Sequence, residues 1–84
     1  MKDEAEKEIR KMQPVMDSLE LNDEKARAVF DMAKSYFNDA KYFLEKGKYL
    51  QAFEAAVISW AYVDAGIHLD VFSVDAKFVK LFTK

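Results

Sequence analysis

Two residues in the second half of the sequence have the spacing of a metal-binding or acid–base pair. Asp64 and His68 lie four positions apart, so a helix would place both side chains on one face. A metal site needs three or four ligands, however, and His68 is the only histidine of a chain that has no cysteine. We therefore interpret the two residues as a hydrogen-bonded surface pair and expect neither a metal nor another cofactor.

Other reactive side chains give weaker signals. Asp39 borders the expected core and, with Asp64 and His68, would flank a pocket between helices; this is the basis of an alternative hypothesis, a small-molecule or nucleotide-binding domain. The chain has no cysteine nucleophile, its serines share one histidine, and its two glycines are too far apart for a phosphate-binding loop. We assign no catalytic residues and do not expect an enzyme.

The composition favours one small helical domain that spans residues 1–84. Hydrophobic residues make up 51% of the chain and charged residues 33%, which is typical of a globular protein rather than a disordered segment. Two glycines and one proline are too few for the turns of an all-β fold. A net charge of −2 gives little support to nucleic-acid binding, which is a third and weaker hypothesis.

The sequence also predicts where the protein resides. Its apolar runs are much shorter than the roughly 20 residues of a membrane-spanning helix, so we expect no membrane association. Residues 1–11 are rich in charge and lack the apolar centre of a signal peptide. A cytoplasmic protein is the resulting expectation.

Hydrophobic periodicity predicts a first helix over residues 3–19 and a second over residues 23–46. Pro14 lies within the first helix and lacks a backbone donor, which predicts a kink or a break there. Asn22 is the expected N-cap of the second helix, because its side chain can accept from free amides of the first turn. Gly47 is the expected left-handed residue at the end of that helix.

A third helix is predicted over residues 48–69, so close to the second that the two form an antiparallel hairpin around Gly47. The result is an all-α, three-helix, up-and-down bundle. A hairpin of this register places Tyr36 near Trp60. Ser59 lies on the inward side of the third helix, where we expect its hydroxyl to bond a carbonyl of the same helix.

The third helix is apolar on two sides. Its second apolar stripe consists of Ile58, Ala61, Tyr62, Ala65 and Leu69. A helix that is apolar nearly all round must be covered nearly all round, here by the first helix, by the C-terminal tail or by another subunit. The interface residues predicted on this ground are Tyr42, Ile58, Tyr62, Ala65, Leu69 and Phe72.

The C-terminal tail, residues 70–84, is too apolar for a disordered end and is predicted to dock on the helices. Two conformations are open at this point. Ser73 would cap a short fourth helix with Phe78 and Phe82 on one face, or the alternation through residues 78–82 would be extended.

Several motifs resemble one small archaeal family. They are the run Asp39-Ala40-Lys41-Tyr42-Phe43-Leu44-Glu45-Lys46-Gly47-Lys48-Tyr49, then Ala52-Phe53, then Asp64-Ala65-Gly66-Ile67-His68-Leu69. The family is domain of unknown function family 357, and the resemblance extends from the second helix to the end of the chain. It implies a three-helix bundle in an archaeal cytoplasm and brings no catalytic residues. Asp70 departs from the family pattern, in which glycine is usual, and this leaves the end of the third helix open.

These features together predict a non-catalytic helical module for protein–protein interaction or self-association. The surplus of apolar surface on the third helix and the tail is the motivation. The partner would be a second copy of the chain, giving a homodimer, or another protein.

Overall fold

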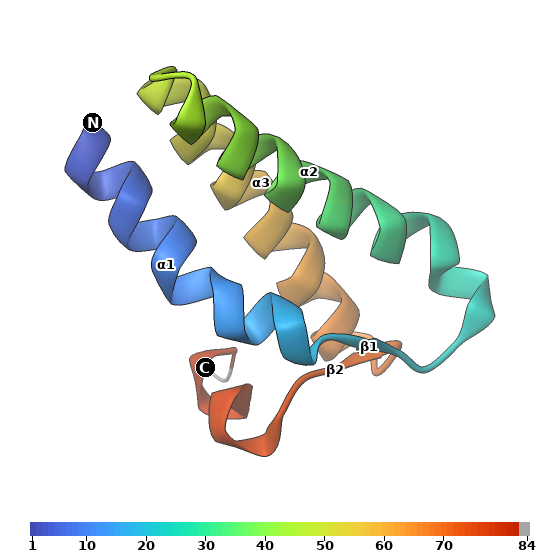
Figure 1. Ribbon diagram of the computed structural model, residues 1–84. Coiled ribbons are helices and arrows are strands. Elements are labelled where there is room, and N and C mark those ends of the chain that lie inside the picture. Colours follow the sequence, from blue (N-terminus) through green and yellow to red (C-terminus); the bar gives the residue numbers. More distant parts are fainter. Residues whose placement is uncertain (83–84) are drawn as a thin grey trace.

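Three long helices, α1 (Lys2–Ser18), α2 (Arg27–Glu45) and α3 (Tyr49–His68), run up, down and up in the computed structural model, which describes residues 1–82 (Figure 1). Two short strands, β1 (Glu20–Leu21) and β2 (Phe72–Ser73), and two 3-10 helices, η1 (Glu24–Ala26) and η2 (Ala76–Leu81), connect and follow them. The predicted all-α three-helix bundle is confirmed.

Helix α1 buries one stripe of apolar side chains against the hairpin of α2 and α3. That stripe consists of Ala5, Ile9, Met12, Val15 and Met16. The helix continues through Pro14 to Ser18, so the alternative of a break at Pro14 is wrong. Pro14 and Arg10 are both exposed, and water can therefore bond the Arg10 carbonyl that Pro14 leaves without a donor.

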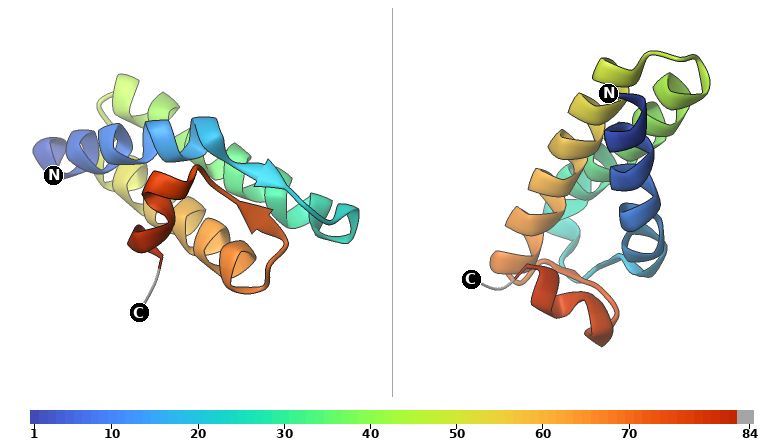
Figure 2. Two further views of the ribbon diagram at one scale, coloured as in Figure 1. Left: turned by 90° about the horizontal axis from the view of Figure 1, so that it is seen from below. Right: turned by 90° about the vertical axis from the view of Figure 1, so that its left-hand side faces the viewer.

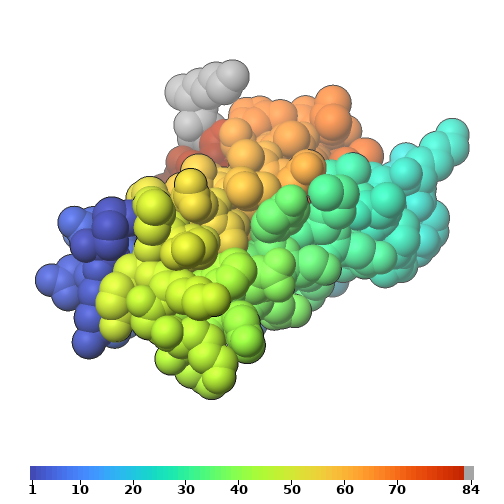
Figure 3. All heavy atoms as spheres, turned by 90° about the horizontal axis from the view of Figure 1, so that it is seen from above, coloured from blue at the N-terminus to red at the C-terminus, as the bar shows by residue number. Residues whose placement is uncertain are grey.

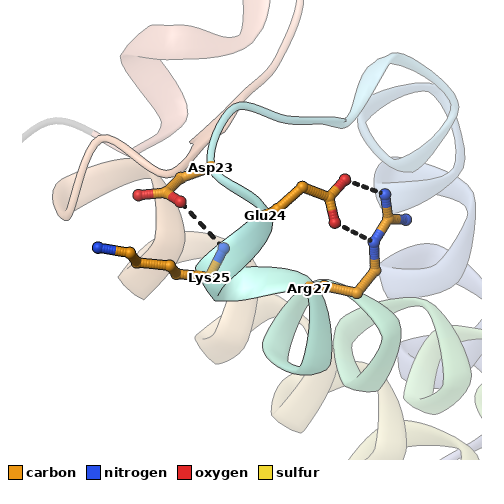
Figure 4. A network of polar contacts seen from close by, with 4 residues as sticks. All are labelled: Asp23, Glu24, Lys25 and Arg27. Atoms are coloured by element: carbon orange, nitrogen blue, oxygen red, sulfur yellow. Dashed lines mark hydrogen bonds and ion pairs between the residues drawn. The ribbon is translucent and has the colours of Figure 1, made fainter.

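The chain enters α2 through a 3-10 turn rather than through the predicted cap (Figure 4). Asp23 is the cap residue, because its backbone is extended and its Oδ1 accepts from the Lys25 amide at 2.9 Å. Arg27 Nη2 donates to Glu24 Oε1 at 2.6 Å and ties the turn to α2. The prediction of Asn22 as N-cap is wrong; Asn22 Oδ1 instead accepts from the Ser73 hydroxyl at 3.2 Å.

Helices α2 and α3 meet at Gly47, whose φ of +76° is the left-handed conformation that was predicted. The Lys48 amide donates to the Phe43 carbonyl at 2.8 Å and closes the turn. The Tyr36 ring, predicted near Trp60, stacks on Tyr62 at 5.9 Å. The predicted partner of Ser59 needs correction: its hydroxyl donates across the hairpin to the carbonyl of Ala33 at 2.7 Å, because its side chain faces α2.

The chain reverses after α3 at Asp70, which adopts a φ of +61° and so takes the conformation for which glycine is usual. Strand β2 then pairs with β1 in antiparallel register, with Glu20 opposite Ser73 and Leu21 opposite Phe72. The strand pair and η2 lie beside α1 and the C-terminal half of α3 (Figure 2).

The tail docks as predicted, and of the two conformations left open it adopts the short helix, as a 3-10 helix with another cap. Residues 72–73 are extended, whereas 76–81 form η2, so an extended run through residues 78–82 is wrong. Asp75 caps η2 by accepting from the Lys77 amide at 3.1 Å, and Ser73 is not the cap. Residues 83–84 of the predicted tail lie outside the described part of the chain.

Two aromatic rings hold the tail in the core. Phe72 is 3% exposed and lies so close to Gly66 that a Cβ on that glycine would overlap its ring. The Phe82 ring stacks on Trp60 at 4.5 Å between centroids. Phe72 was predicted as an interface residue, and this is wrong, because its own chain buries it between Gly66 and Phe30.

Candidate functional site

The polar residues singled out in the sequence do not form one site. His68 Nε2 lies 3.1 Å from Asp64 Oδ1, which is the predicted surface pair, with both side chains more than two-fifths exposed. Asp39 is exposed on α2. Within residues 1–82 no group of three or more His, Asp or Glu side chains is arranged to hold a metal ion.

The ionisable groups with shifted pKa values lie in surface pairs. Hydrogen bonds from Arg27 lower the pKa of the Glu24 carboxyl and raise the pKa of the Arg27 guanidinium in return (Figure 4). The pKa of Glu4 is lowered by a bond from its own backbone amide and by the N-terminal amine. Each shift has a simple local cause at the exposed surface, so none of the three groups points to acid–base chemistry.

A small polar hollow of about 130 Å³ lies between α1 and α2. Its lining residues are Gln13, Met16, Asp17, Lys34, Phe37, Asn38 and Lys41. Lys41 Nζ donates to Gln13 Oε1 at 3.4 Å, while Gln13 Nε2 donates to Asp17 Oδ1 at 2.9 Å. The polar groups thus bond chiefly to one another. Sequence reasoning missed this hollow, because its two walls come from helices whose relative placement no local pattern specifies.

The second apolar stripe of α3 remains uncovered. We define the α3 face as Val57, Ile58, Ala61, Tyr62 and Ala65. Val57 is 46% exposed and Ile58 39%, both alanines are exposed, and Tyr62 is half-buried through its stack on Tyr36. Neither α1 nor the tail reaches these residues, because both pack on the opposite side of the hairpin (Figures 1 and 2).

The α3 face is hollowed where its small residues lie. An open hollow of about 420 Å³ is lined by the five residues of the face, and a second of about 300 Å³, lined by Phe53, Glu54, Val57 and Ile58, adjoins it. Ile58, Ala61, Tyr62 and Ala65 are spaced i, i+3, i+4 and i+7, the four positions that form the receiving hole when a side chain of another helix packs against a helix.

The other predicted interface residues lie apart from these hollows. Leu69 is 72% exposed just beyond the end of α3, and Tyr42 is 56% exposed on α2 beneath the Lys46 ammonium, which lies 5.6 Å from the ring. Val57 was missed by the sequence analysis. Its position four residues before Ala61 on the same helix was the signal that would have included it.

The fold and the surface together define the class of protein. It is a small all-α bundle that leaves an apolar face of α3 exposed and has its described ion pairs at the surface. A family profile described as "Protein of unknown function (DUF357)" matches residues 3–72, and the chain belongs to this family. In structure it is similar to protein AF1782 from Archaeoglobus fulgidus, also of family DUF357, with 27% identity and a TM-score of 0.74 over 88% of this chain and 92% of that one.

A search of curated proteins found no match to the chain. Among residues 1–82, no helix combines the length and the apolar character needed to cross a membrane.

Proposed function

We propose that this protein is a non-catalytic, cytoplasmic interaction module that binds a helix of another protein chain through the α3 face. One observation carries the proposal: a continuous apolar stripe on the longest helix stays open after α1, α2 and the tail have all docked. Exposed apolar patches of this kind are typical of protein–protein contacts.

The shape of the α3 face supports a helical partner. Its hollows are bounded by residues of one helix, which makes them shallow and elongated rather than enclosed. A rod with protruding side chains fits such a surface better than a compact ligand does, because ligand sites bury most of the surface of the molecule they hold.

Ligand-binding hypotheses have less support. The polar hollow between α1 and α2 measures about 130 Å³, well below the range of roughly 300–1,000 Å³ that is usual for small-molecule sites. Nucleic-acid binding has little electrostatic support, because the net charge is −2. Two of the basic side chains are also engaged within the chain: Arg27 pairs with Glu24, and Lys41 bonds Gln13 and lies 4.9 Å from the Phe37 ring.

Thiol labelling tests the proposal, because the natural chain has no cysteine. Ala65→Cys places one thiol on the α3 face, and Ala28→Cys places one at an exposed position of α2 as the matched control. In a cell extract of the source organism, we expect maleimide to react several-fold more slowly at position 65 than at position 28, because a bound helix covers the α3 face. Equal rates at the two positions in the extract would contradict the proposal.

A further inference from the structure

We infer, on the basis of the interaction surface proposed above, that the helix bound by the α3 face is α3 of a second copy of this chain, antiparallel and related by a two-fold axis at Ala61. A two-fold contact requires a self-complementary surface, on which each residue meets a residue displaced equally to the other side of the axis. The α3 face fulfils this condition in shape and in charge.

The shape is complementary about Ala61. Ile58 lies three residues before Ala61 and Ala65 lies four residues after it, on the same flank of the helix. In an antiparallel pair, Ile58 of each copy therefore enters the hollow above Ala61 and Ala65 of the other. Large side chains then oppose small ones, which lets the two helices approach closely and interdigitate.

Ionisable side chains also pair about the same point, and the pair carries opposite charges when His68 is protonated. Glu54 lies seven residues before Ala61 and His68 seven residues after it, so the antiparallel pair brings Glu54 of one copy to His68 of the other at both ends of the contact. His68 already has Asp64 at 3.1 Å, and in the dimer it is flanked by a carboxylate from each copy. A parallel pair would instead oppose Glu54 to Glu54.

The available area fits a weak, concentration-dependent dimer formed through α3. Seen from above, the visible surface consists chiefly of α2 and α3 side by side, with α1 emerging at its N-terminal end (Figure 3). The 20-residue α3 is about 30 Å long and a helix is about 10 Å wide, so its open side projects about 300 Å². A standard interface takes about 800 Å² from each partner, so a contact through α3 belongs to the smaller class of weak interfaces.

Disulfide trapping tests the axis. Ala61→Cys carries a single thiol that lies on the two-fold, where paired helices 8–10 Å apart bring two Cα atoms within disulfide range. Under mild oxidation with copper phenanthroline, we expect the Ala61→Cys chain to form covalent dimers about tenfold faster than Ala28→Cys, because docking raises the effective concentration of the thiol. Circular dichroism of both variants confirms that each is folded.

A mixed reaction tests the antiparallel register. Glu54→Cys and His68→Cys, oxidised together, are expected to form the mixed disulfide in preference to either symmetric dimer. A preference for the symmetric products would overturn the antiparallel arrangement.

Sedimentation of the unmodified protein separates this inference from the proposed function. We expect a monomer–dimer equilibrium in the purified protein. A monomer at every concentration, combined with protection of position 65 in cell extract, would overturn the second copy as partner and leave the interaction function standing. A monomer without protection in the extract would overturn both.

Discussion

The two sides of α3 differ in their surroundings far more than in their composition. On the inner side, Ser59, Val63 and Gly66 are fully buried against α2 and the tail. On the outer side, Val57, Ile58 and the two alanines are as apolar and remain open to solvent. Hydrophobicity therefore distinguishes α3 from a surface helix, but docking of the distant segments decides which of its sides becomes core.

Gly66→Ala tests the close contact between the inner side of α3 and the tail. Alanine improves helix propensity by about 1 kcal/mol, but its Cβ would overlap the Phe72 ring, and overpacking of this kind costs about 3 kcal/mol. We expect a net loss of about 2 kcal/mol in the free energy of unfolding, measured by urea denaturation.

The neighbouring position on the open side is the control for that substitution. In dilute solution Ala65→Gly should lose only the propensity difference of about 1 kcal/mol, because this residue is exposed. If Gly66→Ala stabilised the protein instead, the close contact between α3 and β2 would be wrong.

Trp60→Ala tests how much the packing of the tail against the inner side of α3 contributes to stability. The Trp60 ring stacks on Phe82 and lies 4.9 Å from the Lys11 ammonium, and its removal is expected to cost about 3 kcal/mol. Because the two rings contact each other, the double variant Trp60→Ala/Phe82→Ala should lose less free energy of unfolding than the two single variants lose in sum. Strict additivity in a double-mutant cycle would argue against the stack. Tyr42→Ala, at an exposed ring, serves as the control.

Ser59→Ala should have an intermediate effect. The substitution removes a buried hydrogen bond of 2.7 Å to the Ala33 carbonyl and is expected to cost about 1 kcal/mol. Ser35→Ala, at an exposed position of α2, should leave the unfolding midpoint unchanged. An equal effect of the two substitutions would mean that the bond across the hairpin contributes nothing to stability.

Ile58→Gln should have the smallest effect on the isolated chain. Position 58 is open to solvent and glutamine is a good helix former, so in dilute solution we expect a change of less than about 0.5 kcal/mol. At high protein concentration the same variant should lack the added stability that dimerisation gives the natural chain. A large loss in dilute solution would show that the outer side of α3 belongs to the core.

The sequence predicted the helices closely and the candidate site in part. The periodic apolar residues and Gly47 placed the ends of α2 and α3 to within a few residues. At the start of α2 the prediction failed, because Asn22 and Asp23 are both good caps and only the bond of Asn22 to Ser73 decides between them. Phe72 was wrongly predicted as an interface residue. Its ring packs where Gly66 lacks a side chain, and the local sequence does not show that these two residues meet.

What the sequence by itself determined is the number of helices, the hairpin at Gly47 and an excess of apolar surface on α3. These properties follow from neighbours within one or two helical turns, and the sequence displays such neighbours directly. What only the tertiary structure decided is where the tail lies and which apolar stripe it leaves open. That outcome depends on packing between residues more than 50 positions apart, such as Glu20 and Ser73, whose meeting no periodicity encodes.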